Sequence, residues 1–228
     1  MSKNTKKEKE NLQAVGEALG KGEKFLAENK TKIIRITASV IVVIIVIFGY
    51  IHFVEKPRAN AAQEQISAAQ RYFEIDSFNL ALNGDGINLG FNEIIDEYGS
   101  TKAGSLAHFY AGFCNLHLGD FEEAISQLKN FNEKDEILQA RAYCGIGDAY
   151  VELEQYDDAA SYFMKAANYR ENEFSAAYLM KAGLAYEQLG KYAEALEAYK
   201  KIKTRYSKTV ESQEIDKYIE RTKIKQVK

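Results

Sequence analysis

Residues 112–128 read GFCNLHLGDFEEAISQL, and the chain repeats this pattern as GDAYVELEQYDDAASYF at 147–163 and as GLAYEQLGKYAEALEAY at 183–199. The second residue of the central turn is Gly119, Glu154 or Gly190, so the copies follow one another at steps of 35 and 36 residues. Each copy opens on glycine, and its other fixed positions are an alanine (Ala124, Ala159, Ala195) and a large residue (Leu128, Phe163, Tyr199). A repeat of this length predicts stacked helical pairs.

These small and large positions, recurring in register with the turns, resemble the tetratricopeptide repeat, whose period is ~34 residues. The resemblance implies three repeats over residues 105–207. We expect a small residue of each first helix to face a small residue of the second, with the large side chains filling the space between successive pairs. The chain departs from the family pattern at Asn115, where an aromatic residue is usual, and it lacks the closing proline in all three copies.

The rest of the chain beyond Pro57, its only proline, also shows helical periodicity and no strand-like alternation. We therefore expect an all-α fold, in which a single N-terminal transmembrane helix precedes a tetratricopeptide-repeat solenoid. Residues 61–104 are predicted to form a degenerate helical pair, with helices over 61–74 and 91–98 and a turn at 83–86. Residues 208–228 contain a charged amphipathic helix over 210–225, which suits the polar cap of a solenoid.

Residues 36–54, ITASVIVVIIVIFGYIHFV, form an almost unbroken apolar run. Nineteen helical residues span ~28 Å, close to the ~30 Å of a bilayer's hydrocarbon core. A transmembrane helix over 33–54 is thus predicted, followed by a linker over 55–60. A cleaved signal sequence is the alternative, because Ala59-Asn60-Ala61 has small residues where a peptidase would cut, although a removable apolar stretch is usually only ~7 to 15 residues. A lipoprotein anchor is excluded, since the only cysteines are Cys114 and Cys144.

Charge indicates the orientation of this anchor. Residues 1–35 hold nine Lys and Arg against five Glu, while the whole chain has a net charge of −3. The positive-inside rule favours a cytoplasmic N-terminus and an exported C-terminal domain. The near-neutral charge gives no support to a nucleic-acid partner.

The predicted cytoplasmic tail, residues 1–32, has apolar residues on one helical face, which favours an amphipathic helix ending at Asn29. The alternative is a solvated tail interrupted by three glycines. The apolar residues are Leu12, Val15, Leu19, Phe25 and Leu26.

Sequence patterns for catalysis, cofactors and metals are missing. The chain has no HExxH, CxxC, phosphate-loop or GxGxxG pattern, so we expect no enzyme activity, no cofactor and no metal. Asp85 in NGDG resembles part of a calcium loop, but the other ligand positions do not match, and a turn that uses Asn and Gly for positive φ is favoured. Cys114 and Cys144 could oxidise in an exported domain, but their register favours two separate small thiols.

First helices in this repeat family line a groove that receives peptides. Transfer of that register predicts a partner-binding groove, and Phe109 and Phe113 could instead pack against the upstream helical pair. The groove lacks the Lys, Asn and Arg set by which some members bind the acidic C-terminus of heat-shock chaperones. The predicted lining is Leu106, Phe109, Phe113, Leu116 and His117, then Arg141, Cys144, Asp148, Val151 and Glu152, then Met180, Leu184 and Glu187.

The layout of short tail, single span and repeat domain resembles the ancillary translocon subunit (YfgM-like) family of the bacterial inner membrane. That resemblance implies a non-enzymatic adaptor whose partners are Sec translocon subunits and a membrane-anchored periplasmic chaperone or prolyl isomerase. It also implies a cytoplasmic N-terminus and a periplasmic repeat domain. Two other readings stay open: an envelope-assembly scaffold unrelated to secretion, and an import-receptor-like protein with cytosolic repeats.

Overall fold

The computed structural model describes residues 27–32 and 34–227. The chain divides into two compact units, residues 1–57 and 58–228, and each is described by itself. The amphipathic helix predicted from Leu12 to Leu26 lies outside the described residues. Residues 27–32, which were placed in the tail, are helical.

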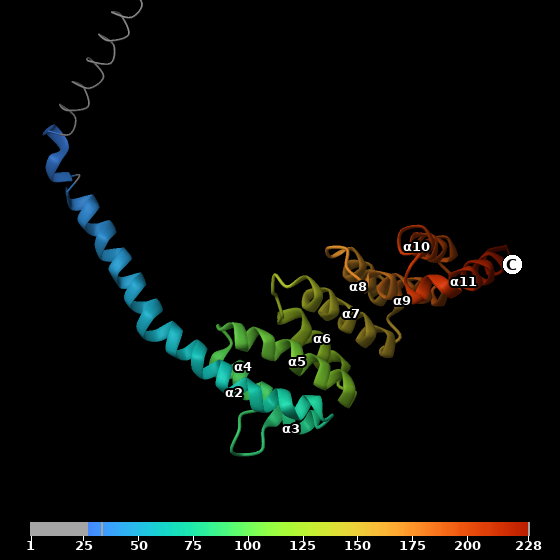
Figure 1. Cartoon of the computed structure of the whole chain (residues 1–228), viewed down its shortest axis with the longest axis horizontal. Helices are drawn as coiled ribbons and strands as arrows, with labels where there is room; N and C mark the ends of the chain where they lie inside the picture. The colour runs from blue at the N-terminus through green and yellow to red at the C-terminus, as the bar shows by residue number, and fades with distance from the viewer. Residues whose placement is uncertain (1–26, 33, 228) are drawn as a thin grey trace, which may run out of the picture. The chain divides into compact units, whose positions relative to one another are not determined.

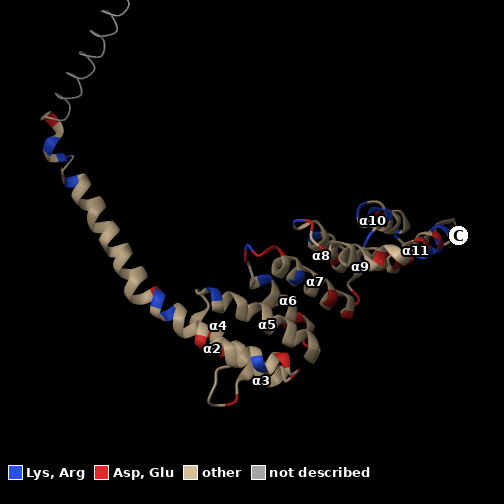
Figure 2. Ribbon diagram, viewed as in Figure 1, with Lys and Arg blue, Asp and Glu red and all other residues tan. Residues whose placement is uncertain are grey.

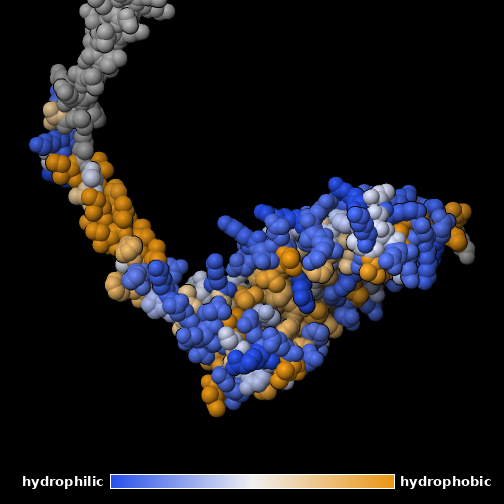
Figure 3. Space-filling view, viewed as in Figure 1, coloured by the Kyte–Doolittle hydropathy of each residue, from blue (hydrophilic) through white to orange (hydrophobic). Residues whose placement is uncertain are grey.

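Apolar residues dominate positions 34–54 of the first unit. In the part of the chain that the structure describes, one helix, Ala27–Glu74, is long and apolar enough to cross a membrane, and a signal sequence would meet the same criterion. Its side chains between Ile34 and Val54 are largely exposed, as the continuous orange surface in Figure 3 shows. Lys30, Lys32 and Arg35 lie at one end of this apolar run and Lys56 at the other (Figure 2).

Residues 55–60, predicted as a linker, are helical instead. A π-helical segment, η1 (Ile51–Glu55), leads directly into α2 (Lys56–Glu74), and the Lys56 N–H donates to the carbonyl of Ile51, five residues back. Pro57 has no N–H to donate to the carbonyl four residues earlier. The change of helical hydrogen bonding next to Pro57 lets the helix continue through the predicted linker.

Helices make up the second unit, which has no strand among its described residues. Three antiparallel pairs, α5 with α6, α7 with α8 and α9 with α10, form its centre, with α2 to α4 packed before them and α11 after them (Figure 1). The all-α repeat fold expected from the sequence is confirmed. The helices after α2 are α3 (Phe78–Asn83), α4 (Phe91–Tyr98), α5 (Lys102–Leu118), α6 (Phe121–Asn130), α7 (Glu136–Glu152), α8 (Tyr156–Asn168), α9 (Ser175–Gln188), α10 (Tyr192–Arg205) and α11 (Val210–Val227).

The same turn joins the two helices of each pair. Its second residue has a positive φ in all three copies: 89° at Gly119, 58° at Glu154 and 68° at Gly190. The N–H of the following residue donates to a carbonyl five residues back in each case, at 2.8 to 2.9 Å. This is the Schellman pattern of helix ends, which requires a left-handed residue and therefore favours glycine. Glu154 adopts the same conformation despite its side chain.

Glycines at the start of each copy allow the paired helices to approach. A Cβ added to Gly147 would lie 2.6 Å from the Phe163 ring, and one added to Gly183 would lie 2.2 Å from the Tyr199 ring. Gly112 is related in the same way to Leu128. We expected each glycine to face the alanine of its partner helix. The structure shows that the large residue of the same pair covers the glycine, because only a residue without Cβ leaves room for that side chain, and at Gly112 the Ala124 carbonyl lies close as well.

The region before the repeats differs from the predicted helical pair. The helix expected at 91–98 is α4, but the short α3 was not predicted, because six residues are too few to show a helical period. Asp85 orders the turn that follows α3: its carboxylate accepts hydrogen bonds from the Tyr72 hydroxyl and from the backbone N–H groups of Ile87 and Asn88. Gly84 and Gly86 have the positive φ expected of this turn, whereas Asn83, for which it was also expected, is the last residue of α3 and does not.

Ion pairs link equivalent positions of successive helical pairs. Five of them join residues 33 or 34 positions apart, close to one repeat: Glu136 with Arg170, Asp148 with Lys181, Asp157 with Lys191, Glu171 with Arg205, and Glu187 with Arg221. The first four of these pairs are solvent-exposed and therefore add little to stability, whereas the Glu187 carboxylate is buried. The last pair continues the same spacing into α11, which therefore takes the place of the next repeat's first helix.

Candidate partner-binding groove

A cavity of about 440 Å³ opens between the first helices α5, α7 and α9. Four of the predicted groove residues line it: Phe113, Arg141, Cys144 and Asp148. Four side chains that the sequence analysis missed join them, namely Ile137, Phe174, Tyr178 and Lys181. The groove thus combines an aromatic and aliphatic wall with a few charged groups, a composition typical of binding sites in proteins.

An ion pair crosses the groove between neighbouring repeats. The Lys181 ammonium donates to both Asp148 carboxylate oxygens, at 2.6 and 2.7 Å, and the Cys144 Sγ lies 3.8 Å from Oδ2. Burial, reinforced by the Asp148 charge, raises the pKa of the Cys144 thiol to about 12. This thiol therefore stays protonated and unreactive at neutral pH. Cys114 is buried in a different core cluster, so the two thiols are separate groups.

Large apolar side chains stand exposed at the rim of this groove. Ile137 has 45% and Phe174 42% of its surface exposed. The Arg141 guanidinium lies 5.4 Å from the centroid of the Phe113 ring, and it forms no ion pair with any described residue. A free guanidinium held beside exposed apolar groups can accept a ligand that carries both an apolar side chain and a carboxylate.

Two smaller cavities adjoin the groove and share Asp148 with it. Val151 and Leu184 line one of about 260 Å³, together with Lys181. Leu116, His117 and Glu152 line the other, of about 400 Å³. The His117 ring also stacks on Phe78 of α3, with centroids 4.3 Å apart. Together the three cavities hold nine of the predicted residues.

Four predicted residues lie elsewhere. Phe109 is buried in the core, where its ring packs against Phe113 and Phe131, with centroids 4.8 and 5.1 Å apart. Leu106 packs against the same core from a half-buried position, and Met180 packs against the core of the last repeats. Both rings thus belong to the core of this helical pair, and Phe113, which is 9% exposed, also lines the groove.

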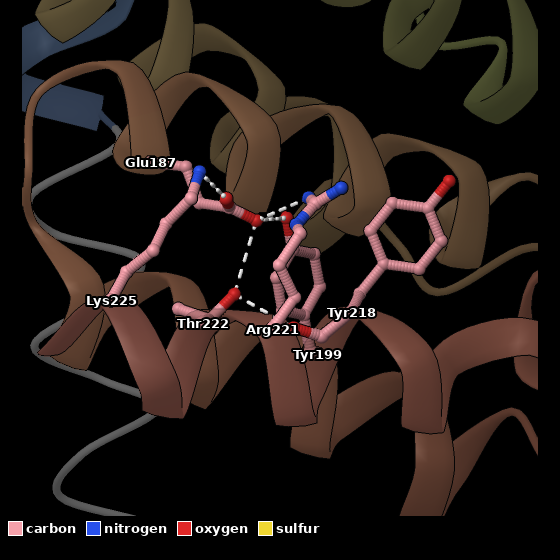
Figure 4. A network of polar contacts seen from close by, with 6 residues as sticks. All are labelled: Glu187, Tyr199, Tyr218, Arg221, Thr222 and Lys225. Carbon is pink, nitrogen blue, oxygen red and sulfur yellow. Dashed lines mark hydrogen bonds and ion pairs between the residues drawn. The ribbon is translucent and has the colours of Figure 1, made fainter.

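Glu187 is the clearest misplacement, because it is only 8% exposed and binds within the protein. Its carboxylate accepts hydrogen bonds from the Tyr199 hydroxyl of α10, at 2.9 Å, and from Arg221, Thr222 and Lys225 of α11, at 2.7, 3.1 and 2.9 Å (Figure 4). Burial alone would raise the pKa of Glu187, but these hydrogen bonds outweigh it and lower the pKa to about 2. Glu187 fixes the cap helix and does not face a partner.

The missed residues have a recognisable pattern. Phe174, Tyr178 and Lys181 follow one another at helical spacing on or just before α9, and they face back toward α7 across the groove. The groove positions that we transferred from the repeat family lie on one face of each first helix. A groove between two neighbouring first helices is also lined by the facing side of the later helix. The i, i+4, i+7 spacing of these three residues could have identified that side of α9.

Comparison with known proteins agrees with this architecture. The family model described as "Tetratricopeptide repeat-like domain" matches residues 24–225. The chain therefore belongs to the tetratricopeptide repeat-like domain family, whose fold is that of a protein–protein interaction adaptor. The match begins well before the three repeats predicted over 105–207. No curated protein matches the sequence.

Solved structures of other repeat proteins share the fold. One is the crystal structure of MamA protein, which is 18% identical with a TM-score of 0.57; the match covers 73% of this chain and 84% of MamA. A second is a crystal structure of the nearly identical TPR-like repeats of a protein described as a Podosopora anserina kinesin light chain. It is 14% identical with a TM-score of 0.56, and the match covers 74% of this chain and 88% of that one. At these identities the likeness shows the fold alone.

Proposed function

We propose that the protein is a membrane-anchored, non-enzymatic adaptor whose groove between α5, α7 and α9 docks a segment of a partner protein. The observation that carries this proposal is the conjunction, in one cavity, of the exposed Ile137 and Phe174 side chains with the Arg141 guanidinium, which has no ion-pair partner among the described residues. Exposed apolar groups around a desolvated centre are where binding energy concentrates in protein interfaces. The partner segment would place an apolar side chain between these groups and a carboxylate on Arg141.

The apolar helix that includes residues 36–54 supports membrane anchoring, and the basic residues of the first 35 positions support a cytoplasmic N-terminus. We further propose that the repeats are exported to the periplasm of a bacterial cell, where the adaptor serves the Sec translocon and a membrane-anchored chaperone or prolyl isomerase. The support for this partner class is the resemblance of the layout to the ancillary translocon subunits.

Capture of partners by the full-length protein from solubilised membranes tests the adaptor role. Phe174→Ala should reduce the recovery of Sec translocon subunits without lowering the melting temperature, because the ring is partly exposed. Glu152→Gln, at the rim, should leave recovery unchanged, and Phe109→Ala should lower thermal stability because it empties a core position. Recovery that is equal for Phe174→Ala and the unmodified protein would rule out the groove as the docking site.

A topology experiment separates the proposed function from its alternatives. A reporter that is active only outside the cytoplasm should be active when fused after Lys228 and inactive when fused at the N-terminus. The opposite result would favour an import-receptor-like protein with cytosolic repeats. An exported domain that captures envelope-assembly proteins and no Sec subunit would favour the scaffold.

A further inference from the structure

A second cavity, of about 270 Å³, lies between α6, α7 and α8 and is separate from the partner-binding groove. Buried Phe131, Gln139 and Ile146 form its floor, and Tyr143 and Tyr162 line its sides. Lys129 of α6 and Lys165 of α8 complete the lining, which includes no Asp or Glu among the described residues.

Both lysines are held by aromatic rings and not by carboxylates. The Lys129 Nζ lies 5.6 Å from the Tyr162 ring centroid and forms no ion pair with any described residue; it donates to the Tyr150 hydroxyl at 3.1 Å. The Lys165 Nζ lies 4.0 Å from the Tyr143 centroid and 5.6 Å from that of Tyr162. Cation–π contacts restrict where these ammonium groups lie while leaving their positive charge uncompensated.

The floor supplies a further donor. Gln139 is 2% exposed, and its Oε1 accepts a hydrogen bond from the Glu133 N–H at 2.9 Å. That bond fixes the orientation of the side-chain amide, so the Nε2 group is the free end, and it donates to no described residue. Gln139 lines the cavity, and its amide is not among the buried polar atoms that lack a partner, so the Nε2 group is open to the cavity, where an atom that enters can accept its hydrogen bond.

The next repeat provides an internal comparison. In the repeat register, Lys129, Tyr162 and Lys165 correspond to Met164, Ala198 and Lys201, which line an equivalent cavity of the same volume between α8, α9 and α10. There the lysine donates to Asn168 at 2.7 Å, and Glu194 and Glu197 join the lining. A lining with hydrogen-bond donors and no carboxylate is therefore a property of the cavity between α6, α7 and α8, and it is not a general consequence of the repeat fold.

We propose that the cavity between α6, α7 and α8 is an oxyanion site that binds one carboxylate or phosphate group, with the Lys129 and Lys165 ammonium groups and the Gln139 amide as donors. Charge-assisted hydrogen bonds from two ammonium groups stabilise an anion far better than neutral donors do. The two tyrosine rings keep both lysines beside the cavity, so the positive charge is in place before the ligand arrives.

Binding titrations of the full chain in detergent, with inorganic phosphate and with acetate at constant ionic strength, test this site. Saturable binding of either anion is expected, and the preferred anion identifies the ligand group. The variant Lys129→Gln/Lys165→Gln should weaken binding about tenfold or more, since each charged hydrogen bond is worth on the order of a factor of ten. Lys201→Gln, in the equivalent cavity, should leave the affinity unchanged.

Gln139→Leu gives a second readout, because it removes the floor donor without changing the charge. It should weaken anion binding while circular dichroism shows an unchanged helical content. The proposal is overturned if neither anion binds above the level of chloride, or if the double lysine variant, folded by the same criterion, binds as well as the unmodified protein.

Discussion

At the residue scale, single side chains determine where the backbone of the repeats is strained and where the cap helix is attached. Glu154 occupies a turn position at which the other two copies have glycine, with φ of 58°. A side chain costs about 1 kcal/mol in this left-handed region. Glu187, in contrast, is a buried carboxylate with four hydrogen-bond donors around it. Glu154 therefore lowers the stability of the fold, and Glu187 raises it.

Glu154→Gly is expected to stabilise the protein by about 0.5 to 1 kcal/mol, because glycine adopts the left-handed conformation without steric cost. Chemical denaturation of the full chain measures this change. As the matched control, Glu152→Gly lies two residues earlier, at the last residue of α7 and outside the left-handed region, so it should give no gain in stability. A loss of stability in Glu154→Gly would mean that this turn does not adopt the repeat geometry.

Glu187 should give the protein an acid-sensitive component of stability. Its pKa is about 2 in the folded chain against an ordinary value of 4.5, so the contribution is complete above pH 4.5 and is lost as the pH falls toward 2. Its size is at most about 3 kcal/mol, since one pKa unit corresponds to about 1.4 kcal/mol. The measurement is the free energy of unfolding at pH 7 and at pH 3. Glu187→Gln should narrow the difference between these two values, and an identical pH dependence in both proteins would contradict the assignment.

At the scale of elements, the helical pairs depend on contact between a glycine and a large side chain. The Phe163 ring covers Gly147, leaving no room for a Cβ. The same relation recurs at Gly112 and Gly183 with different large residues. Each pair is therefore held at a spacing that a single methyl group would disturb.

Gly147→Ala should accordingly destabilise the protein by about 1 to 3 kcal/mol, although alanine is the better helix former. Adding Phe163→Leu to this variant should recover part of the loss, because the smaller side chain leaves room for the new methyl group. Thermal unfolding of the single and double variants measures the coupling. If Gly147→Ala raised the melting temperature, the close contact between α7 and α8 would be disproved.

The sequence predicted the helices whose pattern recurs or is long enough to show a helical period, and it missed the short α3 and the helical path through Pro57. The three turns and the glycine positions were found because each is seen in triplicate. The short α3 and the helical path through Pro57 have no second copy to compare. Phe113 and Phe109 lie one helical turn apart on the same helix and both pack in the core, so only the surrounding side chains decide that Phe113 also lines the groove and Phe109 does not. Glu187 was misplaced because α11 covers a position that stays open in the preceding repeat.

At the scale of the whole molecule, the proposal joins an apolar helix suited to a membrane with a repeat unit suited to protein binding. The surface of the repeat unit seen in Figure 3 is mostly hydrophilic, with apolar side chains gathered toward its middle. Several charged side chains form ion pairs between repeats. Arg141, which lies beside apolar groups in the groove, forms no ion pair with any described residue. The central claim is therefore that the groove between α5, α7 and α9 binds a segment of a partner protein.

Photo-crosslinking in intact membranes tests that claim most directly. A photoreactive amino acid at position 174 should form a covalent adduct with a partner protein, which mass spectrometry then identifies as a Sec translocon subunit or a membrane-anchored chaperone. The same amino acid at position 201, beside α8 on α10, should give little or no adduct. The account is contradicted if position 174 gives no adduct in cells where the protein is folded, or if positions 174 and 201 give the same adducts with equal yield.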